Sequence, residues 1–310
     1  MRVETTMRVE TTMRVGAIDI GTNSTRLLVA DVDRDGRVDE IVRRLAITRL
    51  GEGVDETARL AGPAMRRVDD TVGTYVTEAR GLGVTRILAT ATSAVRDAQN
   101  GPSFLEGIGS RHGVATRLLS GAAEASTTFR GVTSAGPIAD GTLIVDIGGG
   151  STELTVGGDD SVREAVSLQL GCVRLTERFL ASDPPAEQDL AACAAHVELL
   201  LPGLAPGPAI GVAGTITTLA AVDLGLDAYA PERVHGHRLS REAVTGLYDR
   251  LRSVTLAERE RILHLEPRRA PVIVAGAVIL LGVMERYAID AVTVSERDIL
   301  HGIAQLAVAA

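Results

Sequence analysis

The strongest constraint on the fold of this chain is a motif that occurs twice, at equivalent places in its two halves. One short apolar run ends in the sequence DIGTNS at residues 19–24, and another ends in DIGGGSTE at residues 146–153. In each half a second strand, a polar turn and a third strand follow, and a later strand ends at a small-residue loop, Thr92-Ser93 or Gly214-Thr215, that opens a helix. The repeat is too long for a solenoid unit. It predicts an α/β fold of two similar domains whose glycine loops face each other across a central interdomain cleft.

The duplication also predicts the domain boundaries. We expect domain I to span residues 13–130 and domain II to span residues 131–297. A C-terminal helix over residues 298–310 should pack back on domain I. Residues 1–12 are a tandem repeat of MRVETT and are expected to lie outside the core.

The basic side chains exclude several classes of enzyme. The chain has 32 lysine and arginine residues, all of them arginine, and a net charge of −8. A Walker P-loop, a protein-kinase ATP site, and a Schiff-base or pyridoxal-phosphate enzyme each need a lysine. The net negative charge argues against nucleic-acid binding. Phosphate chemistry would therefore use backbone N–H groups, hydroxyls, arginine or metal ions.

We expect a cytoplasmic protein with neither a nucleic acid nor a membrane as its partner. The N-terminus has no apolar segment typical of a signal peptide. The most apolar stretch, residues 270–284, is too short for a membrane span and predicts a buried helix. Cys172 and Cys193 have no spacing typical of a disulfide framework or a metal site, so we expect buried, reduced thiols.

The two glycine loops have the composition of an anion site. Glycine lets the backbone approach a ligand closely, and successive N–H groups in such a turn form an anion nest. The strand-ending carboxylates Asp19 and Asp146 could hold a hydrated Mg²⁺, or Mn²⁺ in its place, beside a phosphate. The residues expected to bind a phosphate substrate are Gly21, Thr22, Asn23, Ser24, Ser93, Arg96, Gly148, Gly149, Gly150, Ser151, Thr152, Gly214 and Thr215.

Several of these candidates have a second interpretation. Arg96 opens a helix after Ser93 and either binds phosphate in a bidentate manner or forms an ordinary salt bridge. Thr215 either touches the substrate or caps a helix. The remaining basic candidates are four arginines that could line a groove or simply lie on the surface, and an H-x-H pair that could bind zinc or belong to a polar loop: Arg233, Arg238, Arg268, Arg269, His235 and His237.

The chain resembles the exopolyphosphatase / guanosine pentaphosphate phosphohydrolase (Ppx/GppA) family of the actin, sugar-kinase and Hsp70 ATPase superfamily. The resemblance runs from residue 17 to residue 280 and rests on AIDIGTNS, ATATSAVRDAQN, LSGAAEA, LIVDIGGGSTE, LGCVRLTERF, GVAGTITTLAA and RRAPVIVAGAVIL. It implies two ribonuclease H-like (actin-like ATPase) domains and Mg²⁺-dependent hydrolysis of a terminal phosphoanhydride. The glutamate of the family's S-G-x-x-E-A motif is Glu124 here, and the resemblance implies that it is the general base.

Glu153 is the second catalytic candidate, because it lies beside the phosphate loop. It could orient water or metal, or support the loop.

One segment departs from the family pattern. The family often ends in G-L-R-E-G, and Leu300-His301 stands here in place of the Arg-Glu pair. No arginine contact is therefore expected at that place.

We expect an exopolyphosphatase that releases terminal orthophosphate from inorganic polyphosphate. The first alternative is hydrolysis of guanosine pentaphosphate (pppGpp) to guanosine tetraphosphate, since both substrates end in a phosphoanhydride. Alternatives of another class are an ATP-dependent small-molecule kinase and a non-enzymatic nucleotide-gated module of the same fold. The resemblance also implies a homodimer.

Overall fold

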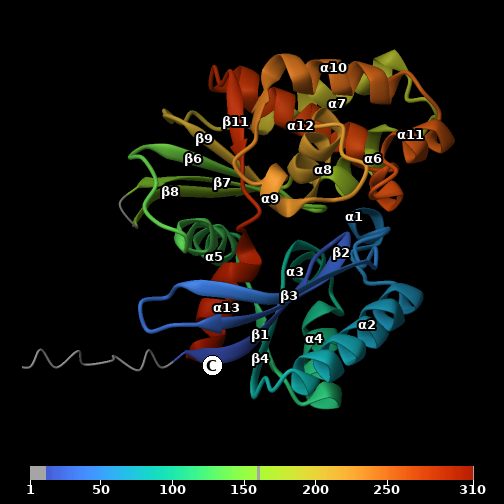
Figure 1. Cartoon of the computed structure of the whole chain (residues 1–310). Coiled ribbons are helices and arrows are strands. Elements are labelled where there is room, and N and C mark those ends of the chain that lie inside the picture. The colour runs from blue at the N-terminus through green and yellow to red at the C-terminus, as the bar shows by residue number, and fades with distance from the viewer. Residues whose placement is uncertain (1–11, 159–160, 310) are drawn as a thin grey trace, which may run out of the picture.

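The computed structural model describes residues 12–158 and 161–309, so nearly all of the predicted N-terminal repeat lies outside the described residues. The chain forms two α/β bodies, each built on its own sheet (Figure 1). Residues of the first half build one sheet, and residues of the second half build the other. The predicted α/β fold with two similar halves is therefore confirmed, whereas the exact domain boundaries remain a prediction.

The first sheet has the strand order β3-β2-β1-β4-β5. Its strands are β1 (Met13–Ile20), β2 (Ser24–Val32), β3 (Val38–Ile47), β4 (Arg86–Ala91) and β5 (Ala115–Leu118). β1 pairs antiparallel with β2 and parallel with β4. Alternate residues of a strand point to opposite faces, so Ile18 and Ile20 face one core while Val15 and Ala17 face another.

The second sheet repeats this plan. It has the order β10-β11-β9-β6-β7-β8. Its strands are β6 (Thr142–Ile147), β7 (Thr152–Gly158), β8 (Ser161–Leu168), β9 (Ala209–Val212), β10 (Arg238–Ser240) and β11 (Ala291–Val294). β6 pairs antiparallel with β7 and parallel with β9, as β1 does with β2 and β4. Asp19 lies opposite Arg26 in the first sheet, and Asp146 lies opposite Glu153 in the second. The repeated motif thus occupies the same register twice.

Helices cover both sheets. Those of the first half are α1 (Val54–Thr57), α2 (Gly62–Gly81), α3 (Ser93–Asp97), α4 (Gly101–His112) and α5 (Gly121–Thr133). Those of the second half are α6 (Cys172–Phe179), α7 (Glu187–Leu200), α8 (Ala213–Asp223), α9 (Pro231–Val234), α10 (Arg241–Arg252), α11 (Leu256–Ile262), the 3-10 turn η1 (Pro267–Arg269), α12 (Ile273–Arg286) and α13 (Ile299–Val308). The elements α1, α9, η1 and β10 were not predicted because they are too short for a periodic pattern, and α10 was not predicted either.

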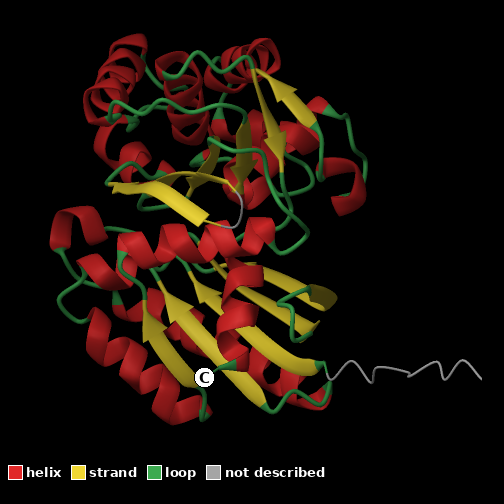
Figure 2. Ribbon diagram, turned by 90° about the vertical axis from the view of Figure 1, so that its left-hand side faces the viewer, coloured by secondary structure: helices red, strands yellow, loops and turns green. Residues whose placement is uncertain are grey.

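Two helices join the halves. α13 returns from the second half and packs on the first sheet, where Leu300 and Ile303 belong to its core. α5 lies between the two bodies (Figure 2), and its Phe129 packs with residues of the second sheet. α5 and α13 touch backbone to backbone, because a Cβ on Gly131 would overlap the carbonyl of Asp298 and one on Gly302 would overlap that of Thr127.

Local signals in the sequence explain where several helices begin. Ser120 caps α5 by accepting a hydrogen bond from the N–H of Ala123. Thr255 and Glu258 form a capping box at the start of α11. The apolar stretch at residues 270–284 contributes the buried helix α12, as predicted. Among the residues that the structure describes, no helix combines the length and apolar character needed to cross a bilayer.

Candidate active site

The two glycine loops meet at a cavity of about 70 Å³ between the halves. In each loop the first glycine N–H donates to the carbonyl of the serine three residues later, Gly21 to Ser24 and Gly148 to Ser151, both at 2.9 Å. Of the predicted site residues, those that line the cavity are Asp19, Gly21, Thr22, Asn23, Ser24, Ser93, Glu124, Asp146, Gly148, Gly149, Gly150, Ser151, Gly214 and Thr215. The predicted residues that line this cavity therefore come from five separate segments of the chain.

The loops lie so close that only glycine fits at their contact. A Cβ added to Gly149 would lie 3.0 Å from the Cβ of Thr22, and one added to Gly150 would lie 2.4 Å from the Oγ of Ser93. Both of these contacts cross from the second half of the chain to the first. The glycines are thus required for close approach of the loops.

Glu124 points into the cavity from the first turn of α5. Arg96 Nη1 donates to its Oε2 at 2.9 Å and to the carbonyl of Leu119 at 3.0 Å. Burial raises the pKa of Glu124 to about 8, and the charges of Asp146 and Asp19 act in the same direction. A carboxylate whose pKa lies near neutrality suits proton transfer from water.

The structure places three predicted residues behind the cavity surface. Arg96 holds Glu124, as described, and its phosphate-binding role remains a prediction. Glu153 is buried on β7 and accepts a hydrogen bond from Ser167 Oγ at 2.7 Å. Burial, together with the charges of Glu124 and Asp146, raises its pKa well above the usual range. Thr152 Oγ1 donates to the carbonyl of Leu170, which supports the loop.

Asp19 and Asp146 have the features expected for a hydrated cation site. Oδ1 of Asp19 is buried and has no hydrogen-bond partner within the described structure. Asp146 accepts a hydrogen bond from Thr128 at 2.8 Å, and burial raises its pKa to about 6. Burial also raises the pKa of Asp19. No group of three or more His, Cys, Asp or Glu side chains suited to a metal occurs among the described residues. Two carboxylates with the remaining positions left to water and phosphate fit Mg²⁺, which keeps much of its hydration shell.

Arginine enters the cavity from two places. Arg26 Nη2 donates to Asp19 Oδ2 at 2.7 Å, and its Nη1 donates to Asp298. The Arg269 guanidinium lies against Gly214, and in the described residues neither a hydrogen bond nor an ion pair engages it. Burial lowers the pKa of Arg269. Arg269 was predicted as a groove residue, whereas Arg26 was not predicted as a site residue. Its signal was its position opposite Asp19, where the second half has Glu153 opposite Asp146.

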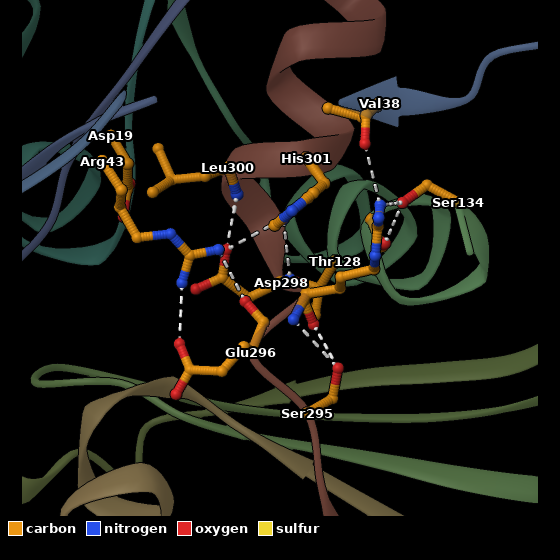
Figure 3. A network of polar contacts seen from close by, with 12 residues as sticks. Asp19, Val38, Arg43, Thr128, Ser134, Ser295, Glu296, Asp298, Leu300 and His301 are labelled. Atoms are coloured by element: carbon orange, nitrogen blue, oxygen red, sulfur yellow. Dashed lines mark hydrogen bonds and ion pairs between the residues drawn. The ribbon is translucent and has the colours of Figure 1, made fainter. Parts of the chain in front are cut away.

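The segment between β11 and α13, called the hinge segment below, carries the chain from the second half back to the first, and His301 lies just after it in place of part of the family's Arg-Glu pair. His301 Nδ1 accepts a hydrogen bond from the N–H of Asp298 at 3.3 Å, which closes a capping box at the start of α13. Its Nε2 lies 2.8 Å from Oε1 of Glu40. Arg43 donates to Glu296 at 2.8 Å (Figure 3). His301 therefore connects the end of the hinge segment and the start of α13 to Glu40 on β3.

A second cavity, of about 380 Å³, opens beside the first. Arg26 and Arg269 line both cavities, and Arg43 and Arg44 line the second. The other groove candidates, which are Arg233, Arg238 and Arg268, are exposed. The H-x-H histidines have separate contacts: His237 lies 2.7 Å from Asp223, and His235 accepts from the N–H of Glu296 at 3.2 Å.

The chain matches known proteins along most of its length. It matches the Ppx/GppA phosphatase family over residues 28–306. It is 38% identical to Exopolyphosphatase 2 of Mycobacterium tuberculosis, with 94% of this chain and 97% of that protein covered. A solved exopolyphosphatase from Cytophaga hutchinsonii superimposes with a TM-score of 0.86 at 30% identity, covering 94% of this chain and 96% of the other. A guanosine-5'-triphosphate,3'-diphosphate pyrophosphatase from Vibrio vulnificus is 30% identical, over 93% of this chain and 58% of that protein.

Proposed function

The chain belongs to the Ppx/GppA phosphatase family, and from this premise we propose that it is an exopolyphosphatase that releases terminal orthophosphate from inorganic polyphosphate. The observation that carries the proposal is the convergence of two phosphate loops, one from each half, on a cavity that also holds Glu124. An exopolyphosphatase is among the relatives, and its match with this chain extends over 97% of its length. The enzyme is thus a phosphoanhydride hydrolase.

Glu124 is the general base. It accepts the proton of a water molecule that attacks the terminal phosphorus in line with the leaving oxygen. The bond between this phosphorus and the bridging oxygen breaks, and the shortened chain leaves as the anion. Arg96 fixes the carboxylate through a 2.9 Å hydrogen bond, which leaves its other oxygen free for the water. Glu153 is not among the residues that line the cavity, and its hydrogen bond with Ser167 joins β7, directly after the second loop, to β8.

The terminal phosphates bind mainly to neutral donors. The backbone N–H groups of both glycine loops and the hydroxyls of Thr22, Ser93 and Thr215 surround the cavity. Asp19 and Asp146 would hold Mg²⁺, which when bound would offset negative charge on the phosphate oxygens. The guanidinium of Arg269, which has no ion-pair partner within residues 12–158 and 161–309, supplies positive charge where the cavity opens into its neighbour.

Hydrolysis of pppGpp is the second candidate, because a relative of the chain is a guanosine-5'-triphosphate,3'-diphosphate pyrophosphatase. Its triphosphate end presents the same terminal phosphoanhydride to the loops. The 380 Å³ cavity beside them has room for more than a bare phosphate chain. Polyphosphate is favoured because the relative of highest identity reported above is an exopolyphosphatase that spans nearly the same length.

Phosphate release from short polyphosphate, long polyphosphate and pppGpp, each with Mg²⁺, tests the proposal. Glu124→Gln keeps the size of the side chain and removes the base, so turnover should fall by about 10²–10⁴-fold on every substrate that is hydrolysed. Glu106→Gln, an exposed glutamate of α4, is the matched control and should keep wild-type turnover. Near-normal turnover of Glu124→Gln would show that another group is the base.

A homodimer and a cytoplasmic location complete the proposal. Both are supported by the family assignment alone. Light scattering coupled to size-exclusion chromatography measures the mass directly, and a mass near 32.4 kDa would exclude the dimer.

A further inference from the structure

One guanidinium spans the cleft on the side away from the hinge. Arg174, on α6, donates from Nε to the carbonyl of Gly150 at 2.8 Å, from Nη2 to Asp97 at 2.5 Å, and from Nη1 to Asp55. Gly150 belongs to the second phosphate loop, whereas Asp55 and Asp97 belong to α1 and α3 of the first half. Only 11% of the Arg174 side chain is exposed, so these contacts are largely shielded from water.

α6 is joined rigidly to the second phosphate loop. The N–H of Cys172 donates to the carbonyl of Gly148 at 3.0 Å, and the N–H of Val173 donates to that of Gly149 at 2.8 Å. The carbonyls of the loop therefore accept from the first turn of the helix. Any movement of α6 away from the first half would carry the loop with it.

Asp97 links Arg174 to the wall of the cavity that the first half provides. Its Oδ2 accepts from Arg174 and also lies 3.3 Å from Ser93 Oγ, and Ser93 lines the cavity. Arg174 thus connects the carbonyl of Gly150, in the second phosphate loop, to Asp97, which is the hydrogen-bond partner of the cavity-lining Ser93.

Neighbouring contacts reinforce the same edge. Arg178 donates to both carboxylate oxygens of Asp55 at 2.8–3.1 Å, and Glu177 accepts from the N–H of Gly53 at 3.1 Å. α1 lies directly beneath α6 at this edge (Figure 1). The hinge network of Asp298 and Glu296 lies where the chain passes from β11 to α13, so the two halves are fastened at two separate places (Figure 3).

The loops around the cavity of about 70 Å³ are in contact across the two halves, because a Cβ on Gly150 would lie 2.4 Å from Ser93 Oγ. The described conformation is therefore a closed one. Opening on the α6 side would break the contacts of Arg174 while leaving the hinge network intact.

We propose that Arg174 is the closure latch of the cleft: a positioning residue that holds the two phosphate loops together and sets the fraction of molecules able to bind substrate tightly. Apparent affinity falls by the fraction of the competent state, whereas a saturating ligand restores that state. The effect on turnover rests on the proposed hydrolase function; the latch itself does not.

Small-angle scattering without substrate tests the latch. Arg174→Met keeps an apolar side chain of similar length and removes every donor, so its radius of gyration should exceed that of the wild type. Arg252→Met is the matched control, because Arg252 also binds two carboxylates, Asp249 and Glu187, but both lie in its own half. An unchanged radius of gyration for Arg174→Met would overturn the proposal.

Kinetics separate a latch from a local support of the loop. For Arg174→Met we expect KM to rise by roughly tenfold, with kcat within about twofold of the wild type. A fall in kcat with unchanged KM and unchanged scattering would mean that Arg174 acts only on its own loop. A wild type that hydrolyses neither polyphosphate nor pppGpp would defeat the proposed function, while the scattering comparison would still decide the latch.

Asp55→Asn is a second test variant in case Arg174→Met fails to fold, because it weakens the Arg174–Asp55 contact from the other half. Arg174 also contacts Gly150 and Asp97, and Asp55 also pairs with Arg178. The double variant Arg174→Met/Asp55→Asn should therefore raise KM by less than the product of the two single-variant increases, because the Arg174–Asp55 contact is lost in both. Additive effects would show that the two residues act independently and would overturn the latch.

Discussion

At the scale of single residues, Gly150 is the position where one carbon atom decides whether the two loops can meet. A Cβ there would lie 2.4 Å from Ser93 Oγ and 2.8 Å from Thr22 Oγ1, so Gly150→Ala requires these side chains or the loops that carry them to shift. A misplacement of about 1 Å can cost about 10²-fold in rate. We expect the rate of phosphate release by Gly150→Ala to fall by that order. Its far-ultraviolet circular dichroism spectrum should match that of the wild type, because the secondary structure is retained.

Gly246 provides the control for this substitution. It lies within α10, and a Cβ there would have no neighbouring atom within 4 Å. Gly246→Ala should keep full activity and raise the free energy of unfolding by about 0.5–1 kcal/mol, since alanine loses less backbone entropy in a helix. Normal phosphate release by Gly150→Ala would show that the loops need not approach as closely as they do here.

At the scale of an element, α13 depends on its first turn for its attachment to the hinge. Asp298 is buried, caps the helix by accepting from the N–H of Leu300 at 2.9 Å, and is paired with Arg26. Burial opposes its ionisation, but Arg26, His301 and Arg43 outweigh this and hold its pKa well below the usual range. Breaking a buried pair costs about 3–5 kcal/mol, so Asp298→Asn should lower the free energy of unfolding by that order at pH 7.

The pH dependence of this loss has a definite sign. A carboxyl whose pKa is lower in the folded state stabilises the fold above its unfolded pKa, near 3.9, and loses that contribution as pH falls through its folded pKa. The difference between wild type and Asp298→Asn in urea unfolding should therefore be full at pH 7 and pH 5 and shrink below about pH 4. Asp290→Asn, at an exposed pair with Arg241, should change stability by less than about 0.5 kcal/mol at any of these values. A difference that grew on acidification would contradict the assignment.

The strands and glycine loops were predictable from the sequence because their signals are local. Apolar runs closed by Asp-Ile-Gly form β1 and β6, and the helical spacing of Val68, Val72 and Val76 is the local signal of α2. The partners of the charged site residues were not predictable in this way. Arg96 and Glu124 meet from separate helices, and Arg26 meets Asp298 across most of the chain length. Such pairs depend on how elements pack, which no local pattern records.

At the scale of the whole molecule, the two halves have largely separate cores. One core is built from the second sheet with α8 and α12, and another from the first sheet with α2 and α4. The cavity is lined by both halves. A ligand in it therefore contacts two bodies that could otherwise unfold independently, and its binding energy should stabilise both.

Scanning calorimetry of Glu124→Gln with short polyphosphate and Mg²⁺ tests this coupling, since the variant does not consume its ligand. A ligand at 100 times its dissociation constant stabilises the folded state by about 2.7 kcal/mol. We expect the whole transition to move to higher temperature and to become more cooperative. Chelation of the metal should remove most of the shift, because a protein of net charge −8 has no general attraction for a polyanion. Sodium chloride at matched ionic strength is the control and should give no comparable shift. If polyphosphate raised the unfolding temperature of one half alone, the two loops would not be binding one ligand.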